Sequence, residues 1–156
     1  MYNSTMITIE KAITTQAKEI SEVIKESVLF EHKKVYPEDK IQNVLGMYTP
    51  EKIEGYINEG NYYIAVEDNK ISGCVYVGKE SEMDSLYVLP EYMRKGIGGM
   101  LAQKAEEHIK GLGHDHVWIW ASLLAIDFYK SRGYIQESDI TDKDGNTWYL
   151  GMRKKF

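Results

Sequence analysis

The sequence is poor in cysteine and proline and has no long apolar run, and each shortage excludes a class of protein. Cys74 is the only cysteine, which excludes an internal disulfide and a zinc site built from several thiolates. There are three prolines and no low-complexity segment, so a single domain over residues 1–156 is expected. No stretch approaches the roughly 20 apolar residues that cross a bilayer, so no membrane partner is expected.

The net negative charge and the N-terminal segment indicate which binding partners and which cellular compartment to expect. The chain has 19 basic and 24 acidic residues, a net charge of -5, which argues against nucleic-acid binding and slightly favours a small cationic partner. Residues 1–6 lack the basic and apolar regions of a secretory signal, and a single cysteine suits a reducing interior. We therefore expect a cytoplasmic protein.

Periodicity predicts strands and helices in a mixed order. A short strand near 7–9 precedes a helix that Thr14 or Thr15 caps, and two short helices begin near Pro37 and Pro50. A hairpin with a turn at 68–69 is expected next, followed by a strand that ends at Pro90. The remaining elements are a helix that follows the glycine-rich turn at 96–99 and ends at 111–113, a strand at 116–121, a short helix at 124–131 and a final hairpin within 134–152.

The glycine-rich turn, Gly-Ile-Gly-Gly at 96–99, is the most informative segment for function. It follows a strand and begins a helix, so unpaired backbone amides gather at the positive end of the helix dipole and favour an anion. Arg94 and Lys95 add positive charge, which suits a phosphate or pyrophosphate. The alternative is a turn that is glycine-rich for packing alone. A dinucleotide fingerprint and a P-loop are both excluded, because position 101 is not glycine and no Lys-Ser/Thr follows the glycines.

A second segment, Ala-Ile-Asp-Phe-Tyr-Lys-Ser-Arg-Gly-Tyr at 125–134, adds to this signal. Together with Met-Arg-Lys-Gly-Ile-Gly at 93–98, it resembles the hallmarks of the GNAT N-acetyltransferases, Gln/Arg-x-x-Gly-x-Gly/Ala and Ala-x-x-Phe-Tyr-x-x-x-Gly-Tyr/Phe. The resemblance covers about 7–152 and implies an α/β (α+β) fold with a mixed, mostly antiparallel twisted sheet of six or seven strands flanked by helices. Two positions depart from the family: Met93 replaces Gln or Arg, and 122–124 lack a common Asn.

The resemblance implies acetyl-CoA as cosubstrate, bound where the strand before the glycine turn splays from the next parallel strand. The backbone of the strand would pair with the pantetheine amides, and the turn would hold the pyrophosphate. The implied cofactor-binding residues are Leu86, Tyr87, Val88, Met93, Arg94, Lys95, Gly96, Ile97, Gly98 and Gly99. The acceptor amine attacks the acetyl group directly, so Cys74 is not needed as a nucleophile and is expected to be a buried strand residue.

Two residues are the predicted catalytic groups. An alkyl amine is about one part in a thousand neutral at pH 7, so a base must take its proton. Glu82 occupies a position where some family members carry that base, and Asp84 on the same face or a water molecule are the alternatives. The competing interpretation is that both acids are solvated or edge-strand carboxylates that only attract a cationic acceptor. Tyr129 matches the family tyrosine that protonates or hydrogen-bonds the leaving thiolate. No metal is expected, because His114 and His116 lack a third ligand.

The acceptor remains open at this point. A polyamine or other small amine is slightly favoured by the acidic balance, with an antibiotic, an amino acid or a protein amine as alternatives. Five acids in the helical region either select a cation or lie at helix starts and the surface: Glu31, Glu38, Asp39, Glu51 and Glu54. A non-catalytic acyl-CoA-binding or sensing domain is the competing function, and a protein-interaction module is a third. The family also pairs as homodimers, which this sequence does not independently indicate.

Overall fold

Seven strands within the described residues, 6–156, form two antiparallel sheets in this computed structural model. The first sheet has the order β1-β2-β3-β4 and the second β5-β7-β6. The strands are β1 (Thr8–Lys11), β2 (Asn61–Glu67), β3 (Lys70–Val77), β4 (Met83–Val88), β5 (His116–Ser122), β6 (Ile135–Thr141) and β7 (Thr147–Lys155). The expected mixed, mostly antiparallel sheet with flanking helices is confirmed.

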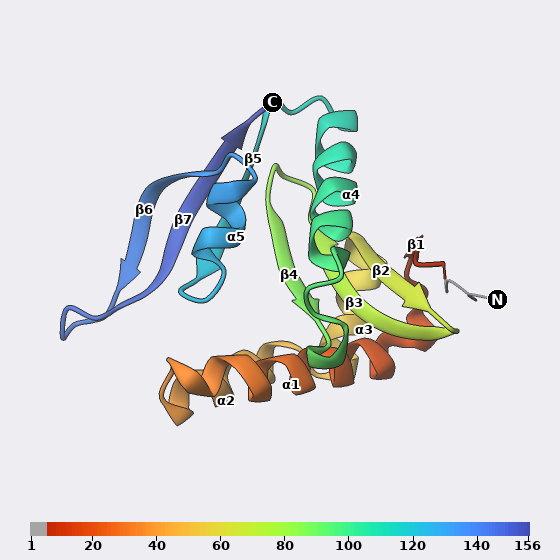
Figure 1. Cartoon of the computed structure of the whole chain (residues 1–156), viewed down its shortest axis with the longest axis horizontal. Helices are drawn as coiled ribbons and strands as arrows, with labels where there is room; N and C mark the ends of the chain where they lie inside the picture. The colour runs from red at the N-terminus through yellow and green to blue at the C-terminus, as the bar shows by residue number, and fades with distance from the viewer. Residues whose placement is uncertain (1–5) are drawn as a thin grey trace.

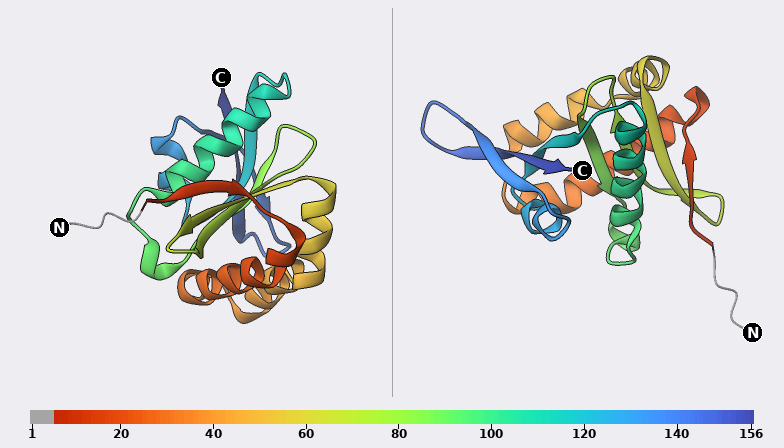
Figure 2. Two further views of the ribbon diagram at one scale, coloured as in Figure 1. Left: turned by 90° about the vertical axis from the view of Figure 1, so that its right-hand side faces the viewer. Right: turned by 90° about the horizontal axis from the view of Figure 1, so that it is seen from above.

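The first four α-helices lie on the two faces of the first sheet, and the fifth packs against β5 of the second sheet. They are α1 (Ala17–Glu31), α2 (Glu38–Met47), α3 (Pro50–Glu59), α4 (Ile97–Gly111) and α5 (Ile126–Ser131). Figure 2 shows the sheet between α4 on one side and the α1–α3 group on the other, and Figure 1 shows the β6–β7 hairpin extending away from this body. Two buried apolar clusters fill the two faces. No helix in the described part of the chain is long and apolar enough to cross a membrane.

Local signals place most elements, with one exception. Asp68 and Asn69 both have positive φ, 53° and 61°, as the two-residue turn of the β2–β3 hairpin requires. The predicted helix cap at Thr14 or Thr15 is wrong: both lie in a 3₁₀ turn, and α1 begins after Gln16 without a side-chain cap. The expectation of a missing signal sequence rests on residues that mostly lie outside the described part of the chain.

The two sheets meet at one point, where β4 and β5 begin side by side and parallel. Glu82 and Trp118 form a single parallel bridge, and the Trp118 amide donates to the Ser81 carbonyl at 2.9 Å. The Ser81 hydroxyl lies 2.9 Å from His116 Nε2, and His116 Nδ1 lies 2.7 Å from Asp115 Oδ1. Beyond this apex the two strands separate toward α1 and α2 (Figure 1), which opens a cleft in the middle of the molecule.

Candidate active site

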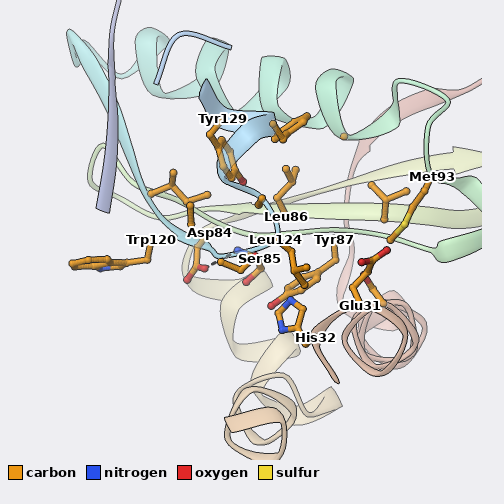
Figure 3. Close-up of a pocket in the computed structure, with 18 of the residues that line it drawn as sticks. Glu31, His32, Asp84, Ser85, Leu86, Tyr87, Met93, Trp120, Leu124 and Tyr129 are labelled. Carbon is orange, nitrogen blue, oxygen red and sulfur yellow. Dashed lines mark hydrogen bonds between the residues drawn. The ribbon is translucent and has the colours of Figure 1, made fainter. Parts of the chain in front are cut away.

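A cavity of about 810 Å³ occupies the space between the separating strands. Residues 84–88 of β4 line one wall and residues 119–122 of β5 and its end line the other. Helix α5 borders the cavity with Phe128 and Tyr129, and the ends of α1 and α2 border it from the opposite side (Figure 3). Because β4 pairs with β3 along one edge and with β5 only at Glu82, its other edge is left with unpaired backbone groups facing the cavity.

The start of α4 forms one end of the cavity. The first hydrogen bond within the helix runs from the Met100 amide to the Gly96 carbonyl at 3.1 Å, so the amides at 97–99 have no partner inside the helix. Gly96 precedes the helix with φ 81° and no side-chain cap. All four residues at 96–99 line the cavity, and Arg94 joins them. Free amides, the helix dipole and a guanidinium make this end complementary to an anion.

Gly98 lets three elements meet at this end. A Cβ atom built on Gly98 would lie 3.6 Å from the Phe128 ring of α5 and 3.9 Å from Val88 Cγ2 of β4. Any side chain longer than a methyl group would therefore extend between these neighbours into the cavity. The absence of a side chain keeps the backbone accessible to a ligand.

A bulge in β4 shapes the wall opposite β5. Ser85 has φ 54°, an uncommon value for a residue with a side chain, and the pairing of β3 with β4 shifts register between Cys74 and Tyr76. The Ser85 amide donates to Asp84 Oδ1 at 2.7 Å instead of to the neighbouring strand. The bulge interrupts the alternation of the strand, and the Asp84 side chain faces the cavity.

Asp84 is the acidic group at the centre of the cavity. Its carboxylate is in contact with the space of the cavity, yet protein surrounds that space on several sides, and this desolvation raises the pKa of Asp84. The Ser85 amide and the neighbouring Tyr48 hydroxyl oppose the rise. Glu82 also has a raised pKa, first from burial and then from the Asp84 charge, but it lies at the apex and is not among the residues that line the cavity.

Tyr129 lies across the cavity from Asp84. Its ring is buried against Phe128 and Tyr134, with centroids 5.0 and 5.2 Å away, and its hydroxyl points into the cavity (Figure 3). Burial is the main cause that raises its pKa, and the Asp84 charge adds to the rise. The hydroxyl therefore keeps its proton at neutral pH and is a hydrogen-bond donor.

The structure gathers nearly all the predicted cofactor-binding residues in this cavity. The residues that line it are Leu86, Tyr87, Val88, Met93, Arg94, Gly96, Ile97, Gly98 and Gly99. Lys95 does not line it; the Lys95 Nζ lies 5.1 Å from the centroid of the Tyr92 ring. Cys74 is fully buried in β3 as expected, and burial raises the pKa of its thiol to about 12, so the thiol is inert at neutral pH.

Sequence reasoning missed the residues at the other end of the cavity. His32, Tyr48, Trp120 and Tyr149 line it, together with apolar residues of α2 and β6. They come from four regions of the chain, and no motif connects them. His32 is mostly buried, and this burial lowers its pKa, so its imidazole is neutral at pH 7. The nearest sequence signal is the aromatic richness of the chain, which does not say where the rings gather.

Comparisons with known proteins agree with this geometry. The model of the acetyltransferase (GNAT) domain family matches residues 32–156. An uncharacterized N-acetyltransferase of Chlorobaculum tepidum is 31% identical over 100 residues, which cover 52% of this chain and 63% of that protein. The chain therefore spans less than two thirds of that relative's length.

Solved structures share the fold along the whole chain. The PaiA N-acetyltransferase of Thermoplasma acidophilum, solved in complex with coenzyme A, has a TM-score of 0.83 and 24% identity, covering 97% of this chain and 99% of that one. A GCN5-related N-acetyltransferase of Rhodopseudomonas palustris has a TM-score of 0.87 and 21% identity, covering 100% and 99%. The family model spans most of the sequence and the fold agrees throughout, so the chain belongs to the GNAT family of N-acetyltransferases.

Proposed function

We propose that this protein transfers the acetyl group of acetyl-CoA directly to a primary amine, with both substrates bound in the cavity between β4 and β5. The observation that carries the proposal is the continuity of two binding features along one wall. The unpaired edge of β4 at 86–88 can pair with the pantetheine amides, and it leads to the free amides at 96–99, which suit the pyrophosphate. The glycine at position 98 leaves room for both.

The residues at the centre of the cavity suit the chemistry of transfer. Acetyl-CoA supplies the activated acetyl group as a thioester. The neutral amine forms the new C–N bond with its lone pair, the C–S bond breaks, and the sulfur leaves as a thiolate. The Tyr129 hydroxyl, which retains its proton, donates a hydrogen bond to this thiolate. The amine proton goes to a base and the thiolate is finally protonated, which gives an amide and free CoA.

Asp84 is the base that the geometry favours over Glu82. Asp84 faces the same cavity as Tyr129, whereas Glu82 lies at the apex where β4 and β5 still touch. A base must lie within hydrogen-bonding reach of the amine or reach it through one water. The raised pKa of Asp84 also makes it a better proton acceptor once it is ionised.

A pair of amide variants tests the proposal and the choice of base. Asp84→Asn should lower kcat by about 100-fold or more and leave acetyl-CoA affinity unchanged, because general-base catalysis contributes roughly this much. Glu82→Gln is the matched control and should change kcat by less than about threefold. A larger loss of kcat in Glu82→Gln than in Asp84→Asn would identify Glu82 as the base instead. Unchanged kcat in both variants would indicate that water or His32 accepts the amine proton.

The pH dependence follows from the direction of the Asp84 shift. Because burial raises its pKa, kcat/KM should fall as the pH drops through a value above that of an ordinary aspartate, and Asp84→Asn should remove this acidic limb. A carboxyl group with a raised pKa destabilises the folded state when it is ionised. Asp84→Asn should therefore raise the melting temperature at pH 7, and the gain should vanish below about pH 4, where both side chains are neutral.

A further inference from the structure

We infer that the acceptor is a monoamine with an aromatic or other apolar body, held in the apolar end of the cavity, rather than a polyamine. This inference rests on the proposed function and names its substrate class. The acceptor end is the part of the cavity between α2 and the β6–β7 hairpin (Figure 1), where Trp120 lies on the side of Asp84 away from Met93 (Figure 3). It is lined by Val44, Met47, Tyr48, Trp120, Ile140 and Tyr149.

The first observation is apolar surface left facing the acceptor end. Met47 is 47% exposed and Ile140 is 42% exposed, and both line the cavity from opposite sides. Large apolar side chains gathered around a cavity are typical of a ligand site, and an apolar ligand would remove their surface from water. Tyr48 and Tyr149 add flat ring surfaces, and Tyr149 stacks on Tyr36 with centroids 5.8 Å apart, which holds its ring in place.

The second observation is the number of carboxylates. Of the five acids in the helical region, Glu31 alone lines the cavity, and its Oε2 lies 3.5 Å from Lys34 Nζ, which offsets its charge. Asp84 is the other carboxylate among the described residues that line the cavity. His32 is neutral and brings no charge. The acceptor end therefore offers one carboxylate without a basic partner, which matches a single ammonium group.

Aromatic rings also attract ammonium groups, so a polyamine is the competing acceptor that an experiment must separate. The rate of thiol release from acetyl-CoA should be compared for 2-phenylethylamine, butane-1,4-diamine and spermidine, using the full chain. We expect kcat/KM for 2-phenylethylamine to exceed that of the diamine by about tenfold or more, because the ring is buried against apolar surface and the second ammonium lacks a partner.

A variant on the rim sharpens the test. Ile140→Asp places a second carboxylate at the acceptor end on an exposed strand, so folding should be maintained. It should lower kcat/KM for 2-phenylethylamine by about tenfold and raise it for the diamine, with acetyl-CoA affinity unchanged. Ile135→Asp is the matched control: it lies on the same strand, is 71% exposed, does not line the cavity and should change neither value.

The outcomes separate this inference from the proposed function. Two outcomes would overturn the monoamine inference and leave acetyl transfer intact. The first is a kcat/KM of the unmodified protein for the diamine that equals or exceeds that for 2-phenylethylamine. The second is a ratio of the two kcat/KM values that is the same in Ile140→Asp as in Ile135→Asp. Absence of thiol release above the blank with every amine tested would overturn the proposed function. Calorimetry of 2-phenylethylamine and the diamine with the CoA-bound protein gives a second readout that does not need turnover, and tighter binding of the diamine would also overturn the inference.

Discussion

The glycine end of the cavity and its acceptor end are built in opposite ways. The glycine end comes from one continuous segment, 86–99, and presents mainly backbone groups and helix-start amides. The acceptor end comes from side chains of α2 and the residue after it, and of β5, β6 and β7, which lie far apart in the sequence. A ligand held by backbone groups is little affected by a side-chain change such as Met93 in place of the Gln or Arg of the family motif. A ligand held by side chains is affected by each substitution among them. We therefore expect the first end to set the cosubstrate and the second to set the acceptor.

The largest effect should come from filling the glycine end. Gly98→Glu would place a carboxylate beside the Phe128 ring and the free amides, where it competes with the pyrophosphate both for space and for positive potential. Acetyl-CoA affinity should fall by at least about 100-fold, because like charges brought together cost several kcal/mol. Isothermal titration calorimetry measures this loss.

The control for this variant lies on the same helix. Gly111→Glu is at the other end of α4, where a Cβ atom would meet nothing within 4 Å. Its acetyl-CoA affinity should stay within about twofold of that of the unmodified protein, since it is far from the cavity. Equal losses in both variants would mean that the effect comes from the helix and not from the anion site.

A smaller effect is expected at the reacting centre between the two ends. Tyr129→Phe keeps the buried ring but removes the hydroxyl that faces the cavity, so kcat should fall by about tenfold or more while acetyl-CoA affinity is kept. Steady-state kinetics combined with calorimetry measures both quantities. Undiminished kcat would limit Tyr129 to packing.

The smallest effect on turnover should come from the support of the acceptor end. The Tyr36 hydroxyl donates to the Trp148 carbonyl at 2.6 Å and accepts from the Leu123 amide at 2.9 Å, so it connects the segment between α1 and α2 with the loop after β5 and with β7. Burial raises the pKa of Tyr36 to about 12, so the donor persists at neutral pH. Tyr36→Phe should cost about 1–3 kcal/mol of unfolding free energy in urea denaturation.

The kinetic pattern of Tyr36→Phe separates the two ends. We expect KM for the amine to rise a few-fold and KM for acetyl-CoA to stay unchanged, because the lost bonds hold β7 and the loop near the acceptor end. A rise in the acetyl-CoA KM alone would contradict the division of the cavity into a cosubstrate end and an acceptor end.

The sequence predicted the glycine end and most of the fold because those features depend on local chemistry. A strand, glycines and a helix start within 83–99 determine where amides are free, and Asp68-Asn69 determines a hairpin turn. The acceptor end depends on how distant elements pack, so neither His32 nor Tyr149 carried a recognisable signal. The bulge at Ser85 could not be predicted from the sequence either. In a regular strand Glu82 and Asp84 lie on the same face, so the sequence does not distinguish them, and the structure alone places Asp84 in the cavity.

Acetyl transfer by this protein can be measured directly as thiol release from acetyl-CoA with an amine panel, against a blank without acceptor. The panel covers arylalkylamines, polyamines, amino acids, aminoglycosides and short peptides. We expect release that depends on one class of amine and that is lost in Gly98→Glu. Binding of acetyl-CoA without release by any amine would contradict this expectation and identify the protein as an acyl-CoA-binding domain that does not catalyse transfer.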